Sequence, residues 1–266
     1  MLENPRSPRV RAVAKLTKRS ARSETGLFLL EGPQAVREAL AYRPEAIVEL
    51  FATPSALERH VDLRAAAAAA GIEVAYSTEA VLDAMADTVT PQGVVAVARQ
   101  FPTSVRDVFA AGPRLVAICE EVRDPGNLGT IIRAADAAGA DAVVLTGRTV
   151  DPYNPKVVRA TTGSLFHVPV SLGGELADVA AAARAAGLRV VAADVKGEDL
   201  LAARAAGDLA RPTAWLFGNE ARGLTAEALA LADGALRLPL YGRAESLNLA
   251  TAASVCLYES AFALRS

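Results

Sequence analysis

The stretch RLVAICEEVRDPGNLGTIIRAADAAGADAVVLT, residues 114–146, decides the fold of the larger part of this chain. It opens with an apolar run, RLVAICE (114–120), which is typical of a buried parallel strand. A Pro-Gly turn, a helical pattern over about 127–139 and a second strand, DAVVLT (141–146), follow. Strand, helix and strand in this order predict two parallel strands joined by a crossover helix.

The same alternation continues toward the C-terminus. Further strands are predicted at 166–170, 188–194, 213–218 and 235–240, and further helices at about 155–162, 174–186, 225–231 and 247–262. Strict alternation favours an open, largely parallel sheet that helices cover on both faces. The fold class is therefore α/β.

A smaller α/β unit is predicted before this sheet. Its strands are expected at 27–30, 46–53, 72–76 and 93–100, and its helices at 33–41, 54–70 and 78–86. Residues 101–113 contain two prolines and a glycine, which is typical of a linker. We therefore expect an N-terminal arm and domain over 1–100, a linker over 101–113 and a second domain over 114–266.

Charge is distributed unevenly along the chain. The 266 residues include 28 Lys and Arg against 30 Asp and Glu, a net charge of −2, so the whole protein has no general attraction to polyanions. Residues 1–23, however, contain seven basic side chains and one acidic one. This segment is either a local binding site for a polyanion or a solvated, partly mobile terminus.

Several classes of site are not indicated. Cys119 and Cys256 lie far apart in apolar runs, and His60 and His167 are isolated, so free buried thiols and no metal site are expected. No apolar run approaches the length of a membrane span, which favours a soluble, cytoplasmic protein. The sequence has no Walker A loop, no G-x-G-x-x-G after a strand and no G-x-S-x-G elbow, which disfavours an unrelated nucleotide-binding enzyme or a hydrolase.

Three segments at strand ends carry polar residues in unusual positions. The first contains Asn127 and Arg133, and the second is GNEARG (218–223), with Glu220 directly after a core strand. In the third, Leu238-Pro239-Leu240 precedes Ser246 and Asn248 at the start of a long helix. Ligands bind at the carboxyl ends of strands in open α/β sheets. The alternative readings are a surface ion pair for Arg133, helix capping for Glu220 and an N-cap role for Ser246.

Together, the three segments resemble the SpoU (TrmH) family of RNA ribose methyltransferases, within the SPOUT superfamily. N-x-G-x-I-x-R at 127–133, G-N-E-x-x-G at 218–223 and L-P…S-L-N at 238–248 are similar to that family's motifs 1, 2 and 3. The run KRSARSETGLFLLEGPQAVREAL (18–40) is similar to the substrate-binding domain of many members. Ala221, where members often have Gly, departs from the pattern and puts the geometry of its loop in question.

The resemblance implies a C-terminal domain with a deep trefoil knot that binds S-adenosylmethionine, and a homodimer with active sites near the subunit interface. The product would be a 2′-O-methylated ribose, with 23S rRNA the leading substrate and tRNA the alternative. The residues that the resemblance assigns to the cofactor pocket are Leu216, Phe217, Gly218, Gly223, Leu238, Pro239, Leu240 and Leu247.

The resemblance also suggests catalytic roles. Family proposals make the motif 1 arginine, here Arg133, a proton acceptor. A guanidinium pKa above about 12 argues against this, so we expect Arg133 to bind a neighbouring phosphate or the developing 2′-alkoxide. Asn127, Glu220, Ser246 and Asn248 would then orient Arg133 and the ribose by hydrogen bonds.

RNA contacts are expected from the N-terminal unit. Lys18, Arg19 and Arg22 are the candidates for phosphate binding there. Arg159, on the predicted 155–162 helix, is a second candidate contact, near the active site. The 2′-hydroxyl distinguishes RNA from DNA, so DNA is not an expected partner. Two alternatives stay open: a catalytically silent RNA-binding or assembly factor on the same fold, and an rRNA methylase that confers antibiotic self-resistance.

Overall fold

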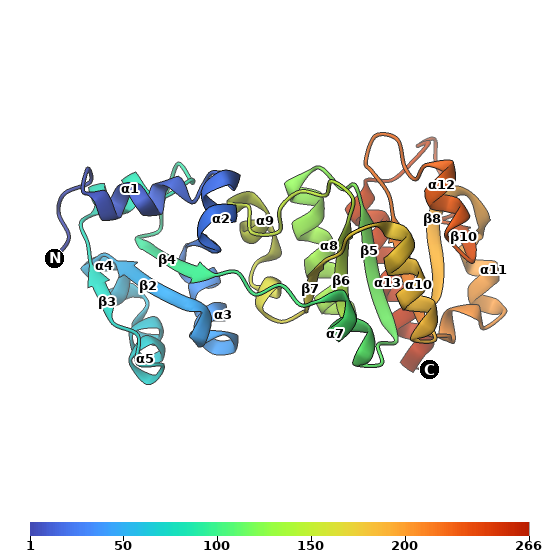
Figure 1. Ribbon diagram of the computed structural model, residues 1–266, viewed down its shortest axis with the longest axis horizontal. Coiled ribbons are helices and arrows are strands. Elements are labelled where there is room, and N and C mark those ends of the chain that lie inside the picture. Colours follow the sequence, from blue (N-terminus) through green and yellow to red (C-terminus); the bar gives the residue numbers. More distant parts are fainter. Residues whose placement is uncertain (266) are drawn as a thin grey trace. The chain divides into compact units, whose positions relative to one another are not determined.

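A computed structural model describes residues 1–265, which form two compact units (Figure 1). Residues 1–101 and 151–167 make up the first unit, and the second comprises the remainder. No helix within the described residues is long and apolar enough to cross a lipid bilayer.

The first unit is built on a four-stranded sheet with the order β1-β4-β2-β3. Its strands are β1 (Leu27–Glu31), β2 (Ile47–Ala52), β3 (Val74–Tyr76) and β4 (Val94–Arg99). Strand β4 runs antiparallel to β1 and β2, and β2 is parallel to β3. The helices are α1 (Pro8–Lys15), α2 (Arg19–Thr25), α3 (Pro33–Tyr42), α4 (Pro54–Arg59), α5 (Val61–Ala69), α6 (Glu79–Met85) and α9 (Pro155–Thr161), with single 3-10 turns at Pro44–Ala46 and Ser164–Phe166. The single helix expected over 54–70 is two helices, which meet at His60.

The basic N-terminal segment is folded and is not a free arm. Helix α1 buries Val10 and Val13, which join a core cluster with Leu82 and Met85 of α6. Its charged residues face outward, as in an ordinary amphipathic helix. The apolar residues between the charges therefore decide the structure of this segment.

The segment Asp151–His167 packs within the first unit, although it lies between two strands of the second. Tyr153 is 1% exposed, and the centroid of its ring lies 4.7 Å from that of the Phe28 ring. Its hydroxyl accepts a hydrogen bond from the Phe101 N–H (2.9 Å). The sequence analysis expected residues 114–266 to form one domain, and the structure instead assigns 151–167 to the first unit. Position along the chain does not reveal which sheet a segment packs against. The strand expected at 166–170 starts later, as β7 (Val170–Leu172).

The second unit is built on a six-stranded sheet with the order β10-β8-β9-β5-β6-β7. Its other strands are β5 (Leu115–Glu120), β6 (Ala142–Thr146), β8 (Arg189–Asp199), β9 (Thr213–Phe217) and β10 (Gly234–Arg237). Every neighbouring pair is parallel, which confirms the predicted sheet. Its helices are α7 (Val105–Ala110), α8 (Pro125–Ala138), α10 (Leu176–Ala185), α11 (Leu200–Ala205), α12 (Ala226–Ala230) and α13 (Leu249–Arg265), with a 3-10 turn at Asp208–Ala210.

Helices cover both faces of the parallel sheet. One face forms a core cluster with α7, α10 and α12, in which Val108 and Phe109 of α7 are buried. The expected linker at 101–113 therefore contributes to this core. Helix α13 covers the other face, where α8 also packs against it (Figure 1). Cys119 of β5 and Cys256 of α13 are buried, and burial raises the pKa of each thiol to about 12, as expected of free, unreactive cysteines.

A buried hydrogen bond attaches α13 to the sheet. The Trp215 indole N–H donates to Ser260 Oγ at 2.9 Å, and both residues are 0% exposed. We expect Ser260→Ala to lower the free energy of unfolding by about 1–3 kcal/mol, because the indole N–H loses its acceptor. Urea denaturation measures this change. Ser254→Ala is the control, since the Ser254 hydroxyl donates to the Ala250 carbonyl of its own helix and to no other group within residues 1–265. An equal loss in both variants would contradict a special role for Ser260.

Candidate active site

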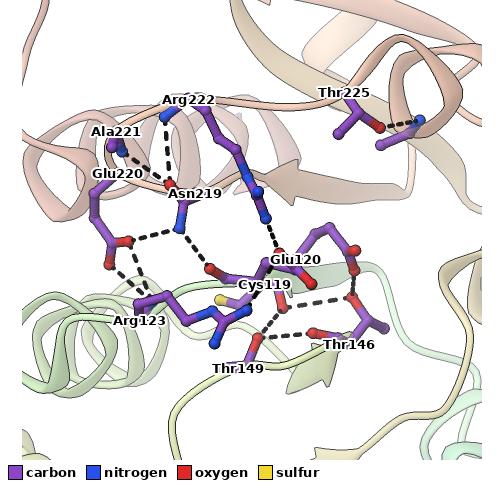
Figure 2. A network of polar contacts seen from close by, with 12 residues as sticks. Cys119, Glu120, Arg123, Thr146, Thr149, Asn219, Glu220, Ala221, Arg222 and Thr225 are labelled. Atoms are coloured by element: carbon purple, nitrogen blue, oxygen red, sulfur yellow. Dashed lines mark hydrogen bonds and ion pairs between the residues drawn. The ribbon is translucent and has the colours of Figure 1, made fainter.

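The loops that follow β5 and β9 meet at the carboxyl ends of these neighbouring strands (Figure 2). Glu220 is the centre of this meeting point. Its carboxylate accepts hydrogen bonds from the backbone N–H of Arg123 (3.2 and 3.1 Å) and of Asp124 (2.9 Å). The side-chain amides of Asn127 and Asn219 lie 3.4 Å from its oxygens. Glu220 thus joins the second motif to the first.

Asn219 stabilises the loop that carries Glu220. Its amide donates to the Glu121 carbonyl (2.9 Å), and its oxygen accepts from the N–H groups of Ala221 (3.0 Å) and Arg222 (3.3 Å). Ala221 has no positive φ, so its departure from the family pattern does not strain the loop.

Asn248 joins the third motif to the first. Its side-chain oxygen accepts from the N–H groups of Ala250 (2.9 Å) and Thr251 (3.2 Å), which makes it the cap of α13. Its amide donates to Asn127 Oδ1 at 2.9 Å. Asn248, Asn127 and Glu220 therefore form a continuous hydrogen-bonded chain across all three segments.

Ser246 does not join this chain. It is exposed, and its side chain makes no hydrogen bond within residues 1–265. The expected helix start at 247 is wrong, as is an N-cap role for Ser246, because α13 begins at Leu249 and Asn248 caps it. Both Ser and Asn are good caps, so sequence preference alone does not separate them.

Arg133 also lies apart from the chain of amides. It is exposed on α8 and makes no ion pair or hydrogen bond within the described part of the molecule, so the surface ion pair considered from the sequence is not found. Arg133 follows Asn127 by six residues on α8, which corresponds to a rise of roughly 9 Å and a rotation of about 120° between the two side chains. The expectation that Asn127, Glu220, Ser246 and Asn248 orient Arg133 is thus not met by any contact within one chain.

The residues expected in a cofactor pocket differ in exposure. Leu216 and Phe217 are 0% exposed, and the Phe217 ring stacks on Trp215, so these two residues present no surface to a ligand. Leu238 and Pro239 are half-buried. Leu240 and Leu247 are 38% and 40% exposed, which leaves apolar surface on the loop before α13.

Glycine is required at Gly218, where the loop after β9 folds back on itself. A Cβ there would lie 2.6 Å from the Gly223 carbonyl carbon and 2.7 Å from the Leu224 nitrogen. Gly223 has a φ of +67°, which favours glycine. A tight backbone loop, exposed leucines and nearby amides suit a ligand with an apolar face and polar edges, as S-adenosylmethionine has.

An acidic residue that the sequence analysis did not single out completes the loop contacts. Glu121 has a φ of +52°, and its carboxylate pairs with Arg222 and with Arg123 (3.4 Å). Desolvation acts in the opposite direction, but these guanidinium groups hold the pKa of Glu121 below its ordinary value. Positive φ in a non-glycine residue is uncommon and often marks functional sites. No pattern in the sequence predicts the positive φ of Glu121.

The basic residues expected to contact RNA fall into two groups. Lys18 and Arg19 are exposed and make no ion pair within residues 1–265. Arg22 is 1% exposed: its Nη1 donates to the carbonyls of Leu16 (2.8 Å) and Thr17 (2.9 Å), and its Nε donates to Asp151 (2.7 Å). The expected phosphate-binding role of Arg22 is therefore wrong, because its charge is already neutralised inside the fold.

Arg159 also forms ion pairs within the first unit. Its two terminal nitrogens pair with Glu31 (2.9 Å) and Asp87 (3.0 Å). Two carboxylates and one guanidinium have a net negative charge, which disfavours a phosphate contact at Arg159. Among the described residues, no three His, Cys, Asp or Glu side chains are grouped as a metal site would require.

Removing the Arg22 side chain should destabilise the first unit. We expect Arg22→Ala to lower the free energy of unfolding by about 3–5 kcal/mol, because it leaves Asp151 and two carbonyls without their donor. Arg19→Ala, three residues away and exposed, should change it by less than about 0.5 kcal/mol. Chemical denaturation of both variants is the test, and a similar small change in both would show that the buried pair contributes little.

Family models match both parts of the chain. The model of the SpoU rRNA methylase family matches residues 114–258, and a model described as RNA 2′-O ribose methyltransferase substrate binding matches residues 29–104. The 23S rRNA (guanosine(2553)-2′-O)-methyltransferase RlmP of Bacillus subtilis is 35% identical over 262 residues, covering 97% of each chain.

Solved structures show the same likeness. The AdoMet-bound rRNA methyltransferase of Sinorhizobium meliloti superposes with a TM-score of 0.82 at 34% identity, covering 97% of this chain and 96% of that one. The SpoU methyltransferase AviRb of Streptomyces viridochromogenes, in complex with AdoMet, has a TM-score of 0.77 at 30% identity, covering 97% and 98%. A family model that matches more than half of the chain, together with these relatives, establishes that the protein belongs to the SpoU rRNA methylase family.

Proposed function

We propose that this protein transfers a methyl group from S-adenosylmethionine to a ribose 2′-oxygen of 23S rRNA. The observation that carries the proposal is the hydrogen-bonded chain from Asn248 through Asn127 to Glu220, which joins three distant segments at one edge of the parallel sheet. The relatives support the substrate, since RlmP is named as a 23S rRNA ribose methyltransferase.

The residues at this edge suit cofactor binding. S-adenosylmethionine, when bound, supplies an activated methyl group on a sulfonium. The backbone around Gly218 and the apolar side chains of Leu238, Leu240 and Leu247 would hold its non-reacting parts. Glu220 and Asn127 keep the loop after β5 in place, and such positioning contributes directly to the rate of an in-line displacement.

Arg133 is proposed to act as a cation and not as a base. A guanidinium remains protonated at neutral pH, and that of Arg133 has no protein partner within residues 1–265. It is therefore available to an RNA phosphate or to the negative charge that develops on the 2′-oxygen.

We also propose that the protein acts as a homodimer, with the trefoil knot and the cytoplasmic location of its family. Exposed Val255 (38%), Tyr258 (37%) and Phe262 (52%) form an apolar strip along α13, which supports self-association. Light scattering coupled to gel filtration would give twice the chain mass if this is so, and the mass of one chain if it is not.

RNA phosphates are proposed to bind at Lys18 and Arg19. Neutralising both with alanine should reduce the magnitude of the slope of log K against log salt by about 1.4–1.8, since each lost phosphate contact removes about 0.7–0.9. The control is the Arg64→Ala, Arg106→Ala double variant, in which two other exposed arginines are removed. Filter binding of an rRNA fragment at several salt concentrations measures the slope, and an unchanged slope would remove Lys18 and Arg19 from the RNA-binding surface.

Transfer of a tritiated methyl group tests the activity as a whole. The protein is incubated with labelled S-adenosylmethionine and total RNA from a strain that lacks it, and the product is mapped by nuclease digestion. We expect label in one 2′-O-methylated nucleotide of 23S rRNA. RNA binding without any label would instead identify a catalytically silent RNA-binding factor, and label in tRNA would contradict the proposed substrate.

A further inference from the structure

A cavity of about 210 Å³ lies in the first unit, between the end of β1, the loop 86–93 and α9. Its polar lining comes from Glu31, Thr88, Thr90, Gln92 and Arg159. Except for Arg159, these residues fall within the range that matches the substrate-binding model. None of the residues proposed to bind the cofactor or the RNA phosphates lines this cavity.

Ion pairs and backbone hydrogen bonds hold the back of the cavity rigid. The Glu31 side chain is 4% exposed, and its carboxylate accepts from Arg159 (2.9 Å) and from the N–H groups of Asp87 and Thr88 (3.0 Å each). Arg159 also pairs with Asp87 (3.0 Å). These bonds attach the loop 86–93 to β1 and to α9, so the shape of the cavity is set before a ligand arrives.

The side chains at the front of the cavity have unused hydrogen-bonding capacity. The hydroxyls of Thr88 and Thr90 and the Gln92 amide make no hydrogen bond within residues 1–265, although they line a concave site. Gly32 allows Gln92 to approach: a Cβ there would lie 3.1 Å from Gln92 Oε1, and the φ of Gly32 is +86°. An amide and two hydroxyls offer both donors and acceptors.

The size and charge of the cavity indicate which part of an RNA chain, phosphate or base, it can bind. Two carboxylates, Glu31 and Asp87, surround the single guanidinium of Arg159, so a phosphate would be repelled. About 210 Å³ is less than the roughly 300–1,000 Å³ of sites for drug-sized ligands, so the cavity suits a small group such as a single base. A neutral base with donors and acceptors on its edge fits both conditions.

We propose that this cavity takes up one unpaired base of the rRNA substrate, with Gln92 and Thr90 bonded to its edge. The first unit would then select the substrate by a base that is free of pairing, in addition to its phosphate contacts. Unpaired bases are the usual targets of sequence-specific RNA recognition. The inference rests on the proposed function only in taking rRNA as the ligand.

Chemical footprinting tests this proposal with 23S rRNA transcript as the probe. Dimethyl sulfate and a carbodiimide report whether the Watson–Crick edge of each base is accessible. We expect one unpaired base that the wild-type protein protects and that becomes reactive again with the Gln92→Ala, Thr90→Val double variant. The Kd for the transcript should rise about 4- to 100-fold, since each of the two lost hydrogen bonds corresponds to roughly 2- to 10-fold.

Val89 supplies the matched control. It is 97% exposed between Thr88 and Thr90 and does not line the cavity, so Val89→Ala should leave the footprint and the Kd unchanged. Identical footprints and Kd values for the wild type and the double variant would overturn the proposal. A reduced salt dependence in the double variant would also overturn it, because that result would indicate a phosphate in the cavity.

The same experiment separates this proposal from the proposed function. Footprints need no catalysis, so a base that depends on Gln92 and Thr90 would support the cavity even if no methyl transfer is found. Methyl transfer by the wild type with no such base would leave the proposed function standing and remove the base-binding role.

Discussion

Replacing Glu220 with glutamine is expected to lower kcat for rRNA methylation by about 100-fold, because a displacement of the reacting groups by about 1 Å has an effect of this size. The Glu220 carboxylate accepts hydrogen bonds from two backbone N–H groups of the loop after β5 and lies 3.4 Å from the Asn127 amide. Glutamine would direct an NH₂ group toward these donors, so the loop would have to move.

The same substitution should reduce stability modestly. Unpaired buried or half-buried donors cost about 1–3 kcal/mol, so the free energy of unfolding should fall by that amount while the protein remains folded. Glu227→Gln is the matched control, because Glu227 is an exposed carboxylate on α12 in the same unit. Single-turnover methylation at saturating RNA measures the rate. Equal rates for the two variants would show that Glu220 does not position the site.

Arg133→Lys is expected to lower kcat by about 100- to 1,000-fold, the usual effect of removing one donor that stabilises a developing oxyanion. Lysine keeps the positive charge but lacks the planar, forked geometry of a guanidinium. The Kd for S-adenosylmethionine should stay within about twofold of the wild-type value, because Arg133 lies apart from the three loops that would hold the cofactor.

Arg211→Lys is the control for this substitution, since Arg211 is an exposed arginine that precedes β9 at its amino end. Rates are compared at saturating cofactor, and cofactor affinity is measured separately by calorimetry. A wild-type rate for Arg133→Lys would end the proposed role of this guanidinium. A large loss of cofactor affinity would instead place Arg133 in the cofactor pocket.

Much of the catalytic unit follows from the sequence, because long apolar runs and helix signals are local. The alternation over 114–240 predicts a parallel sheet, and the structure has six parallel strands there. The convergence of Asn127, Glu220 and Asn248 could also be anticipated, since all three lie near the carboxyl ends of strands or at the start of a helix packed beside them.

The features that sequence reasoning missed depend on distant partners. Arg22 looks like an RNA contact by its charge, yet Asp151, 129 positions later, neutralises it. The segment 151–167 belongs to the first unit, where Tyr153 packs against Phe28. Ser246 and Asn248 are both suitable caps, and only the contact between Asn248 and Asn127 decides between them.

Calorimetric titration with S-adenosylhomocysteine, the demethylated product, tests most directly whether three separated loops build one cofactor site. The account predicts saturable binding at one site per chain. It also predicts that Asn127→Ala and Asn248→Ala each weaken binding and that the double variant loses less binding free energy than the sum of the two single losses, because the two amides share one hydrogen bond. No heat of binding in the folded wild-type protein would contradict the account.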